Sequence, residues 1–458
     1  MKPLSPLDNA ILFMERRAQP MHVGALCLLR PPPDAPPDFV LQLSERLRRS
    51  AAAVPPFNRR LASRFGIRFW EESPDFDLAQ HFVHLALPRP GRIRELLAMI
   101  SRVHAAHLDR AYPLWRVYLI EGLEDGRIAL YAKIHHAMAD GVTGIRLLTL
   151  SMAADPDASR ALPPPWEMCA PKKQRRSLPV PAPALRGIDA MRALAREGIG
   201  GVRPVLARMA QTLRDQRAGH PDCVGSLQAP PSIFNQPISS SRRFAAQSYS
   251  AARIKAIARR FDTTSNDVVL AICGAALRRY LLELGRLPER PLIAAVPVST
   301  SRQERDSGNE IAFALSHLGT HIADPRKRLR AIKACMDYNK SVLRSLAPAQ
   351  LLAYEGLMFA PGVFNLLTGV SRRRSIVNLV ISYVPGPRRR LYWQGCELEG
   401  LYPVSLIVDS VALNITLVAR HDALDFGLLG CRKTLPHLQR LLEFLGDSIA
   451  ELEAAGQT

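Results

Sequence analysis

The most informative segment of this sequence is KIHHAMADG, residues 133–141. Neighbouring side chains point to opposite faces of a strand, or lie about 100° apart around a helix, so the imidazoles of His135 and His136 cannot both address one reacting atom. We therefore expect one histidine to carry out chemistry and the other to support it.

These residue types suit proton transfer. A histidine with a pKa of about 6.5 can take a proton from an alcohol or a thiol at neutral pH when a neighbour fixes its ring. We assign the general-base role to His136 and the supporting role to His135. Asp140 would organise the loop through an arginine or through backbone amides, and Gly141 would permit a tight turn. The residues alone leave an alternative open, namely a core histidine beside a loop aspartate.

The residues before this segment predict a β-hairpin and two helices. Two short apolar runs, 114–122 and 127–134, meet at Glu124-Asp125-Gly126, and the second run leads directly into His135. Residues 38–53 and 92–109 space their apolar side chains as amphipathic helices do.

A proline-rich break separates two halves. Residues 155–240 contain Pro163-Pro164-Pro165 and one helical stretch near 184–217, and this length indicates a connector. Beyond it, the pattern predicts helices near 250–260, 266–284, after Asp324-Pro325 and at 436–452, and strands at 291–297, 376–384 and 413–419. We expect an N-terminal half over 1–157, a connector over 158–240 and a C-terminal half over 241–458. Irregular mixing of strands and helices favours an α/β fold of the mixed α+β kind over a Rossmann sheet.

Composition limits the class of protein. The 458 residues include 61 Lys+Arg and 41 Asp+Glu, a formal charge of +20, and 47% of them are hydrophobic. These values exclude a disordered, collagen-like or coiled-coil chain. The positive charge fits a solvated surface best, then attraction of anionic lipid or of a CoA thioester. Nucleic acid fits least, because no nucleic-acid module is recognisable.

Features that bear on localisation are few. The seven cysteines are spread singly without a CxxC pair, which is typical of a reducing compartment. Residues 1–17 lack the apolar core of a signal peptide, and no uninterrupted apolar run of about 18 residues occurs. We expect a cytoplasmic protein that is soluble or peripheral to a membrane.

Other kinds of site have weaker support. The pairs His317/His321 and His104/His107 have spacings that could bind a metal, but no third ligand is patterned near either pair, so we expect no metal. Cys273 lies in an apolar helix and is expected in the core. No GxSxG, Walker A or GxGxxG sequence occurs, which argues against a serine hydrolase, a P-loop enzyme and a Rossmann dinucleotide site.

The histidine segment also carries a resemblance to a known family. Residues 135–141, HHAMADG, match the HHxxxDG sequence of bacterial wax ester synthase/acyl-CoA:diacylglycerol acyltransferases, and the chain is similar to that family nearly end to end. Eight further sequences match the family and occur in the same order along the chain: PMHVG (20–24), LPRPG (87–91), PLW (113–115), NDV (266–268), PVS (297–299), VPGP (384–387), ALNIT (412–416) and DFGL (425–428).

The resemblance implies the fold of CoA-dependent acyltransferases: two similar α/β halves with a channel between them and the histidine loop at its midpoint. It further implies that His136 deprotonates the hydroxyl of a long-chain alcohol or diacylglycerol, which attacks the thioester of acyl-CoA. No acyl-enzyme, metal or cofactor is implied. Gly141, Asn266 and Asp267 would position substrate, and Asn266 could help to stabilise the oxyanion. An N-cap role for Asn266 is an equal alternative.

Two departures from the family pattern bear on the choice of acceptor. Tyr383 stands where the family usually has asparagine, and the segment from Val298 through Thr300-Ser301 is one residue longer than usual. The apolar segment 351–370 is expected in the core, with contact to a membrane or a lipid droplet as the alternative.

Two other functions stay open. Polyketide-associated and condensation-type acyltransferases share HHxxxDG but seldom the PLW, ND and VPGP set. A non-catalytic basic protein that binds lipid or nucleic acid would bind less tightly as salt increases.

Overall fold

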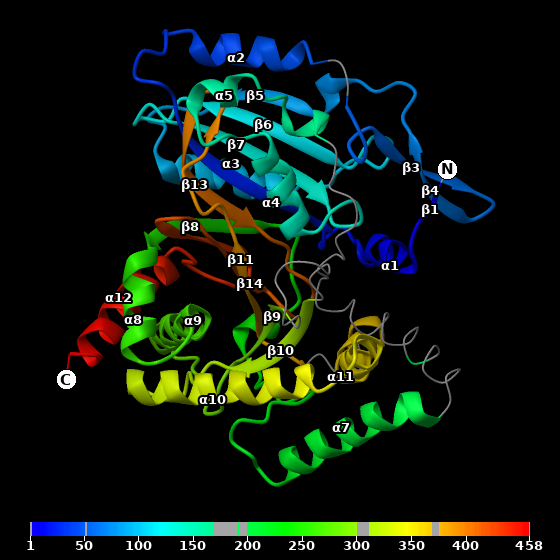
Figure 1. The fold of residues 1–458 in the computed structure, drawn as a ribbon, viewed down its shortest axis with the longest axis vertical. Helices are drawn as coiled ribbons and strands as arrows, with labels where there is room; N and C mark the ends of the chain where they lie inside the picture. Colours follow the sequence, from blue (N-terminus) through cyan, green and yellow to red (C-terminus); the bar gives the residue numbers. More distant parts are fainter. Residues whose placement is uncertain are drawn as a thin grey trace.

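Two six-stranded sheets, one above the other in Figure 1, form the framework of the molecule, and a smaller three-stranded sheet lies at one side. The computed structural model describes residues 2–50, 53–168, 191, 199–299, 311–368 and 375–457.

The first sheet has the strand order β12-β13-β2-β7-β6-β5. Its strands are β2 (His22–Arg30), β5 (Phe82–Ala86), β6 (Trp115–Glu121), β7 (Ile128–His135), β12 (Tyr392–Trp393) and β13 (Cys396–Val404). The predicted hairpin is confirmed, because β6 and β7 pair antiparallel and β7 ends on His135.

Alternation along the central strands sorts side chains onto two faces. Ala132 and Ile134 of β7 stand opposite Ala25 and Val23 of β2, whereas Lys133 and His135 stand opposite Gly24 and His22. The face with Lys133 and His135 packs against α3 (Ile93–Ala105), and the other face packs against α2 (Phe39–Arg48) and α4 (Gly141–Leu150). The helices predicted over 38–53 and 92–109 are confirmed, each a few residues shorter than expected.

The second sheet has the order β10-β9-β11-β14-β15-β8. β11 pairs parallel with β9 and β14, and the other pairs are antiparallel, so the sheet is mixed. Its strands are β8 (Arg242–Ser250), β9 (Ile293–Ser299), β10 (Ile311–His317), β11 (Leu379–Pro385), β14 (Leu413–Ala419) and β15 (Ala423–Cys431). The predicted helices around it are also present: α8 (Ala251–Arg260), α9 (Ser265–Glu283), α10 (Pro325–Arg344) and α12 (Arg440–Ala455).

A strand pair from late in the chain joins the two halves. β12 and β13 complete the first sheet, where β13 pairs antiparallel with β2. Asp425 of β15 is fully buried and accepts hydrogen bonds from the Leu401 amide of β13 (2.8 Å) and from Arg420 Nε (2.6 Å). A Cβ on Gly427 would lie 1.9 Å from the Pro403 carbonyl oxygen, so glycine permits this close approach. Two residues of the DFGL sequence, Asp425 and Gly427, thus hold β13 against β15. The predicted division of the chain into two halves and a connector, at 157/158 and 240/241, stays a prediction.

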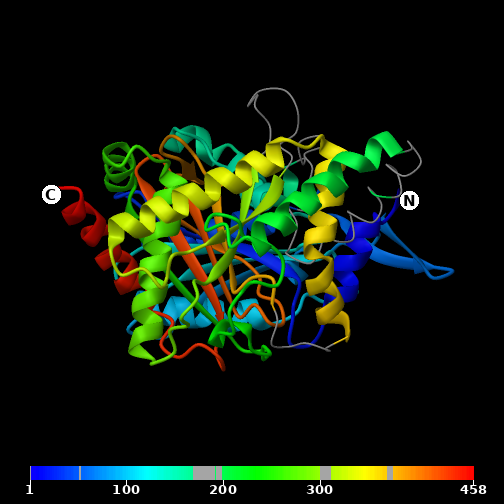
Figure 2. The same cartoon turned by 90° about the horizontal axis from the view of Figure 1, so that it is seen from below.

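Of the helix predicted near 184–217, the structure gives α7 (Ile199–Arg217); residues 184–190 and 192–198 lie outside the described part. α7 lies beside α11 (Pro348–Thr368) in both views (Figures 1 and 2). The side chains of Leu351, Tyr354 and Phe359 are buried, which agrees with the core position expected for this part of 351–370. Side chains beyond residue 361 of that segment lie outside the described set.

The remaining elements are short or lie at the edges. They are α1 (Pro6–Met14), α5 (Pro156–Arg160), the 3-10 turns η1 (Leu78–Gln80), η2 (Pro165–Glu167) and η3 (Ile233–Asn235), and the small sheet β1 (Lys2–Pro3), β4 (Ile67–Glu72) and β3 (Arg59–Arg64). Within the described ranges, no helix has the length and apolar character needed to cross a membrane. Cys273 is fully buried and free, as expected.

Candidate active site

Backbone hydrogen bonds hold the two histidines in place. The His136 amide donates to the Met21 carbonyl oxygen (2.8 Å), and the His135 amide donates to the Leu114 carbonyl oxygen (2.9 Å). The PMHVG and PLW sequences therefore support the histidine pair through their main chains. Residue His135 is 1% exposed and His136 is 6% exposed, so neither ring faces bulk water.

Asp140 organises the turn through a backbone amide, one of the two ways predicted. It is the N-cap of α4, and its Oδ1 accepts a hydrogen bond from the Thr143 amide (2.7 Å). Gly141 occupies the first helical position without a left-handed φ, so the predicted glycine-dependent turn is wrong. A Cβ on Gly141 would meet no atom within 4 Å, because the residue borders a pocket.

We expect Asp140→Ala to lower the free energy of unfolding by about 1 kcal/mol, because the first turn of α4 loses its cap. Asp140→Asn is the control, since its side-chain oxygen can accept the same hydrogen bond. Urea unfolding of both variants measures the difference. Equal stability of wild type and the alanine variant would show that the cap does not hold this turn.

Glu15 is a buried neighbour of the histidine pair that sequence reasoning missed. Its Oε1 lies 3.5 Å from His135 Nε2 and accepts a hydrogen bond from the Met21 amide (3.1 Å). Its Oε2 accepts from the Arg110 guanidinium (2.8 Å). Burial by itself would raise the pKa of Glu15, but His135, Arg110 and the Met21 amide outweigh it and lower this pKa to about 2. A buried carboxylate is therefore fixed beside His135 at neutral pH.

Both ring nitrogens of His135 lie close to groups inside the protein. The Ala137 amide donates a hydrogen bond to Nδ1 (3.1 Å), so the ring proton sits on Nε2, which faces Glu15. This arrangement fits the supporting role predicted for His135, because the ring is held by the turn on one side and by a carboxylate on the other.

Other polar groups on the same face of the sheet have structural partners. Lys133 Nζ donates to the carbonyl oxygens of Val103 (2.9 Å) and Ala106 (2.7 Å) at the end of α3, and burial lowers its pKa to about 7. His104 Nε2 donates to the Ser405 carbonyl oxygen (2.8 Å), and the Tyr131 hydroxyl donates to its Nδ1 (2.6 Å). Burial lowers the pKa of His104 to about 3, which keeps the ring neutral.

The histidine pairs considered for metal binding do not converge with further ligands. His104 is engaged as above, and His107 contacts Glu15 and the Arg17 carbonyl oxygen. Across the described residues, no three His, Cys, Asp or Glu side chains come together as a metal site.

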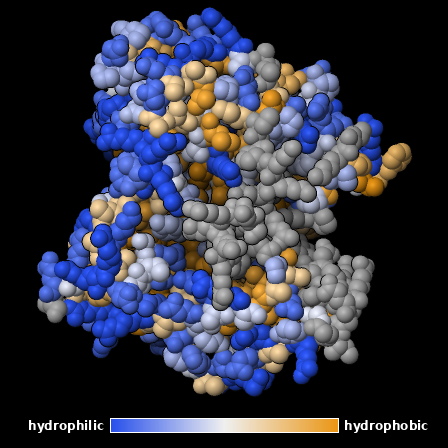
Figure 3. Space-filling model, in the orientation of Figure 1, coloured by the Kyte–Doolittle hydropathy of each residue, from blue (hydrophilic) through white to orange (hydrophobic). Residues whose placement is uncertain are grey.

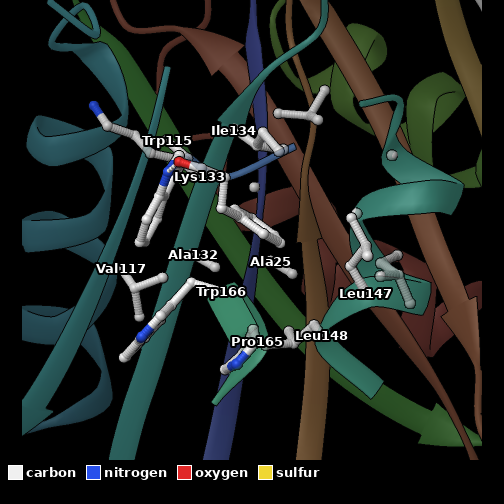
Figure 4. A pocket seen from close by; sticks show the side chains of 16 residues that line it. Ala25, Trp115, Val117, Ala132, Lys133, Ile134, Leu147, Leu148, Pro165 and Trp166 are labelled. Atoms are coloured by element: carbon white, nitrogen blue, oxygen red, sulfur yellow. Dashed lines mark hydrogen bonds between the residues drawn. The ribbon is translucent and has the colours of Figure 1, made fainter. Parts of the chain in front are cut away.

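An apolar pocket lies beside the histidine turn, on the opposite face of the sheet from His135 (Figure 4). The non-atom space within it is about 540 Å³, a figure that includes space open to solvent. One wall is formed by Trp115 and Trp166, whose stacked rings lie 5.8 Å apart, and the opposite wall by Leu147 and Leu148 of α4.

The pocket contains almost no polar chemistry. Its floor is formed by Val23, Ala25 and Ala132 of neighbouring strands. Lys133 is the one charged residue among those lining it, and its ammonium is turned away toward the end of α3. Along the chain, the lining stops at Ile134 and resumes at Gly141, so the pocket flanks the turn that carries His136.

In the second half, the structure separates the roles of Asn266 and Asp267. Thr264 is the N-cap of α9, and Asp267 completes a capping box by accepting a hydrogen bond from the Thr264 amide (3.2 Å). The N-cap alternative for Asn266 is therefore wrong. In the part of the chain that the structure describes, no hydrogen bond joins Asn266 to His136. Both substrate-positioning roles stay predictions.

The two departures from the family pattern lie around β9 and β11. Tyr383 is half-buried on β11 opposite Leu417 of β14, and burial raises its pKa. Val298 lies near the end of β9, whereas Thr300-Ser301 falls outside the described residues.

Two domains of a known protein family match most of this chain. Residues 4–269 match the wax ester synthase/diacylglycerol acyltransferase catalytic domain, and residues 307–453 match the C-terminal domain of the same family. The chain is 43% identical to O-acyltransferase WSD of Acinetobacter baylyi, over 99% of this chain and 97% of that protein. It is also 43% identical to a probable diacylglycerol O-acyltransferase of Mycobacterium tuberculosis, over 99% of each.

Solved structures extend the comparison. A wax ester synthase/diacylglycerol acyltransferase from Marinobacter aquaeolei VT8 is 40% identical over the full length of both chains, with a TM-score of 0.82. The first condensation domain of the calcium-dependent antibiotic synthetase, at 16% identity and a TM-score of 0.59, shares the fold alone. The mixed fold of two acyltransferase-like halves is confirmed. The chain belongs to the wax ester synthase/diacylglycerol acyltransferase family of acyltransferases.

Proposed function

We propose that this protein transfers a long-chain acyl group from acyl-CoA to the hydroxyl of a long-chain alcohol, a diacylglycerol or both, with His136 as general base. The imidazole takes the hydroxyl proton while the oxygen attacks the thioester carbonyl carbon. The carbon–sulfur bond then breaks, and the CoA sulfur takes the proton from the imidazolium. The products are an ester and free CoA, without an acyl-enzyme, a metal or a cofactor.

One observation carries the proposal: a buried histidine turn, fixed by two separate segments, flanks a pocket lined almost wholly by hydrocarbon. The Met21 and Leu114 carbonyl oxygens hold the main chain of the pair, and Asp140 starts the helix that follows. Such preorganisation favours a reaction in which both substrates must meet one imidazole in a defined orientation. The pocket supplies the apolar surface that a fatty chain requires.

Release of free thiol from palmitoyl-CoA tests the proposal, with hexadecanol or dipalmitoylglycerol as acceptor. Acceptor-dependent release supports acyl transfer to a hydroxyl, and the ratio of the two rates gives the acceptor preference. Absence of release with both acceptors would contradict the proposal. Release with an amine acceptor instead would indicate a condensation-type protein, and no release with any acceptor would indicate a non-catalytic protein.

Gly144 provides a test of the pocket. It lies on α4, and a Cβ there would make an ordinary contact of 3.7 Å with Ile134 Cγ2, so a larger side chain would fill the pocket. We expect Gly144→Leu to lower kcat/KM for the longest chains about tenfold relative to short ones, because about two methylene groups lose their burial.

The measurement uses one series of acyl-CoA lengths and one series of alcohol lengths, so it also shows which chain enters the pocket. Gly144→Ala is the control. It should raise the stability of α4 by roughly 0.5–1 kcal/mol and leave chain-length dependence nearly unchanged. An equal loss at every length in both series would contradict the assignment of the pocket to a substrate chain.

A further inference from the structure

The hairpin of β3 and β4 projects from the body of the protein and carries apolar side chains at its tip (Figures 1 and 2). Phe65 is 104% exposed and Ile67 is 57% exposed, on either side of Gly66. Figure 3 shows apolar atoms gathered at this projecting point, with hydrophilic atoms next to them. The tip therefore holds apolar surface that the chain itself does not cover.

The turn gives Phe65 a conformation that this residue rarely adopts. Phe65 has φ of 51° and Gly66 has φ of 77°, so both central residues of the two-residue turn are left-handed. Asparagine, aspartate or glycine normally fills the first of these positions, because other side chains are strained there. Here a phenylalanine occupies the position, and its ring gains no burial inside the protein in return.

The base of the hairpin is anchored, so the tip is held in a fixed direction. Leu61 and Trp70 are opposite each other in the ladder and pack against the main hydrophobic core. β4 also pairs with β1, and the Leu4 amide donates to the Arg68 carbonyl oxygen (3.0 Å).

Arginines occur along the whole hairpin, whereas its acidic residues are confined to the base. Arg64 and Arg68 lie beside the exposed apolar residues, whereas the acidic residues, Glu71 and Glu72, lie at the base. Glu71 is already paired with Arg60 at 3.1 Å, and its contact with the well-exposed Arg64 is long, 3.9 Å. The tip thus combines exposed apolar side chains with an excess of arginines over acidic residues.

A strand of another protein is a poor fit to this hairpin. β3 is the edge of its sheet and carries arginines at 59, 60 and 64, and charges on an edge strand oppose pairing with a further strand. The combination at the tip instead complements a surface with an apolar interior and an anionic boundary.

We propose that the β3–β4 tip docks this protein on an anionic phospholipid membrane. Phe65 and Ile67 enter the boundary between headgroups and acyl chains, and Arg64 and Arg68 contact lipid phosphates. This surface is separate from the histidine turn and does not depend on the function proposed for it.

Sedimentation of the full chain with vesicles of mixed phosphatidylcholine and phosphatidylglycerol tests the docking surface. We expect the double variant Phe65→Ser/Ile67→Ser to bind about a hundredfold more weakly, because two large apolar side chains lose their burial. Arg64→Gln and Arg68→Gln should each weaken binding about fivefold, and vesicles of pure phosphatidylcholine should bind more weakly than mixed ones.

Leu282→Ser is the matched control, since Leu282 is 52% exposed on α9 in the other half of the molecule and should leave vesicle binding unchanged. Equal binding of wild type and the Phe65/Ile67 variant would overturn the proposal. So would a variant that binds vesicles normally but loses self-association in sedimentation equilibrium, because the tip would then dock on a second copy of the chain.

Discussion

Replacing His136 by alanine is expected to lower the rate of CoA release by a factor of about 10²–10⁴, the usual contribution of a positioned general base. The residual rate would come from holding the two substrates together. Free-thiol release with palmitoyl-CoA and hexadecanol measures the loss. A thermal unfolding transition close to that of wild type serves as the check that the variant is folded.

His135→Ala is the matched comparison and should be milder. The His135 ring lies against the Ala137 amide and Glu15, on the face of β7 that packs against α3, so its removal disturbs support rather than proton transfer. Turnover like that of wild type in the His136 variant would remove the base assignment. A larger loss in the His135 variant than in the His136 variant would reverse the two roles.

Glu15→Gln is expected to lower the free energy of unfolding at neutral pH by about 3 kcal/mol, which corresponds to lowering a carboxyl pKa from 4.5 to about 2. Glutamine keeps the shape and an acceptor for the Met21 amide but loses the charge that faces His135 and Arg110. Glu124→Gln is the control, because Glu124 forms an exposed pair with Arg92 that contributes less than about 1 kcal/mol.

The sign of the pH dependence follows from the direction of the shift. The pKa of Glu15 is lower in the folded state than in the unfolded state, so its contribution is fully present above about pH 4.5 and is lost as pH falls toward about 2. Urea unfolding of wild type and variant at a series of acidic pH values should show the stability difference shrinking. A difference that stays constant over that range would contradict the account of Glu15.

Local pattern was enough to predict the parts of the fold that are close in sequence. The hairpin that ends on His135 and the helices α3, α8 and α10 follow from periodicity, turn residues and a proline at a helix start. β13 could not be predicted in the first sheet, because its partner β2 is more than three hundred positions away and nothing in either strand specifies the pairing. Tertiary pairing of this kind is not encoded in local periodicity.

The site, like the fold, could be predicted only where its residues are close together in the sequence. The sequence singles out His136 and Asp140 because their spacing carries chemistry within one segment, and the base role of His136 stays a prediction. Glu15 could not be predicted, since it precedes His135 by many residues and no motif surrounds it. The capping box of α9 had a usable signal, a threonine at 264 with an acidic residue three positions later, and it assigns Asp267 to the start of that helix. The pocket has no sequence signal, because its lining consists of ordinary core residues. Which of them face one another depends on how α4 packs against the sheet.

The most direct test of the central claim compares two alcohols of equal chain length, hexadecanol and an analogue with two fluorine atoms on the carbon next to the carbinol. The fluorinated hydroxyl is more acidic, so it needs less help from a base. If His136 takes the hydroxyl proton, the ratio of CoA-release rates between wild type and His136→Ala will be much smaller with the fluorinated alcohol. The same ratio for both alcohols would show that His136 does not act on that proton.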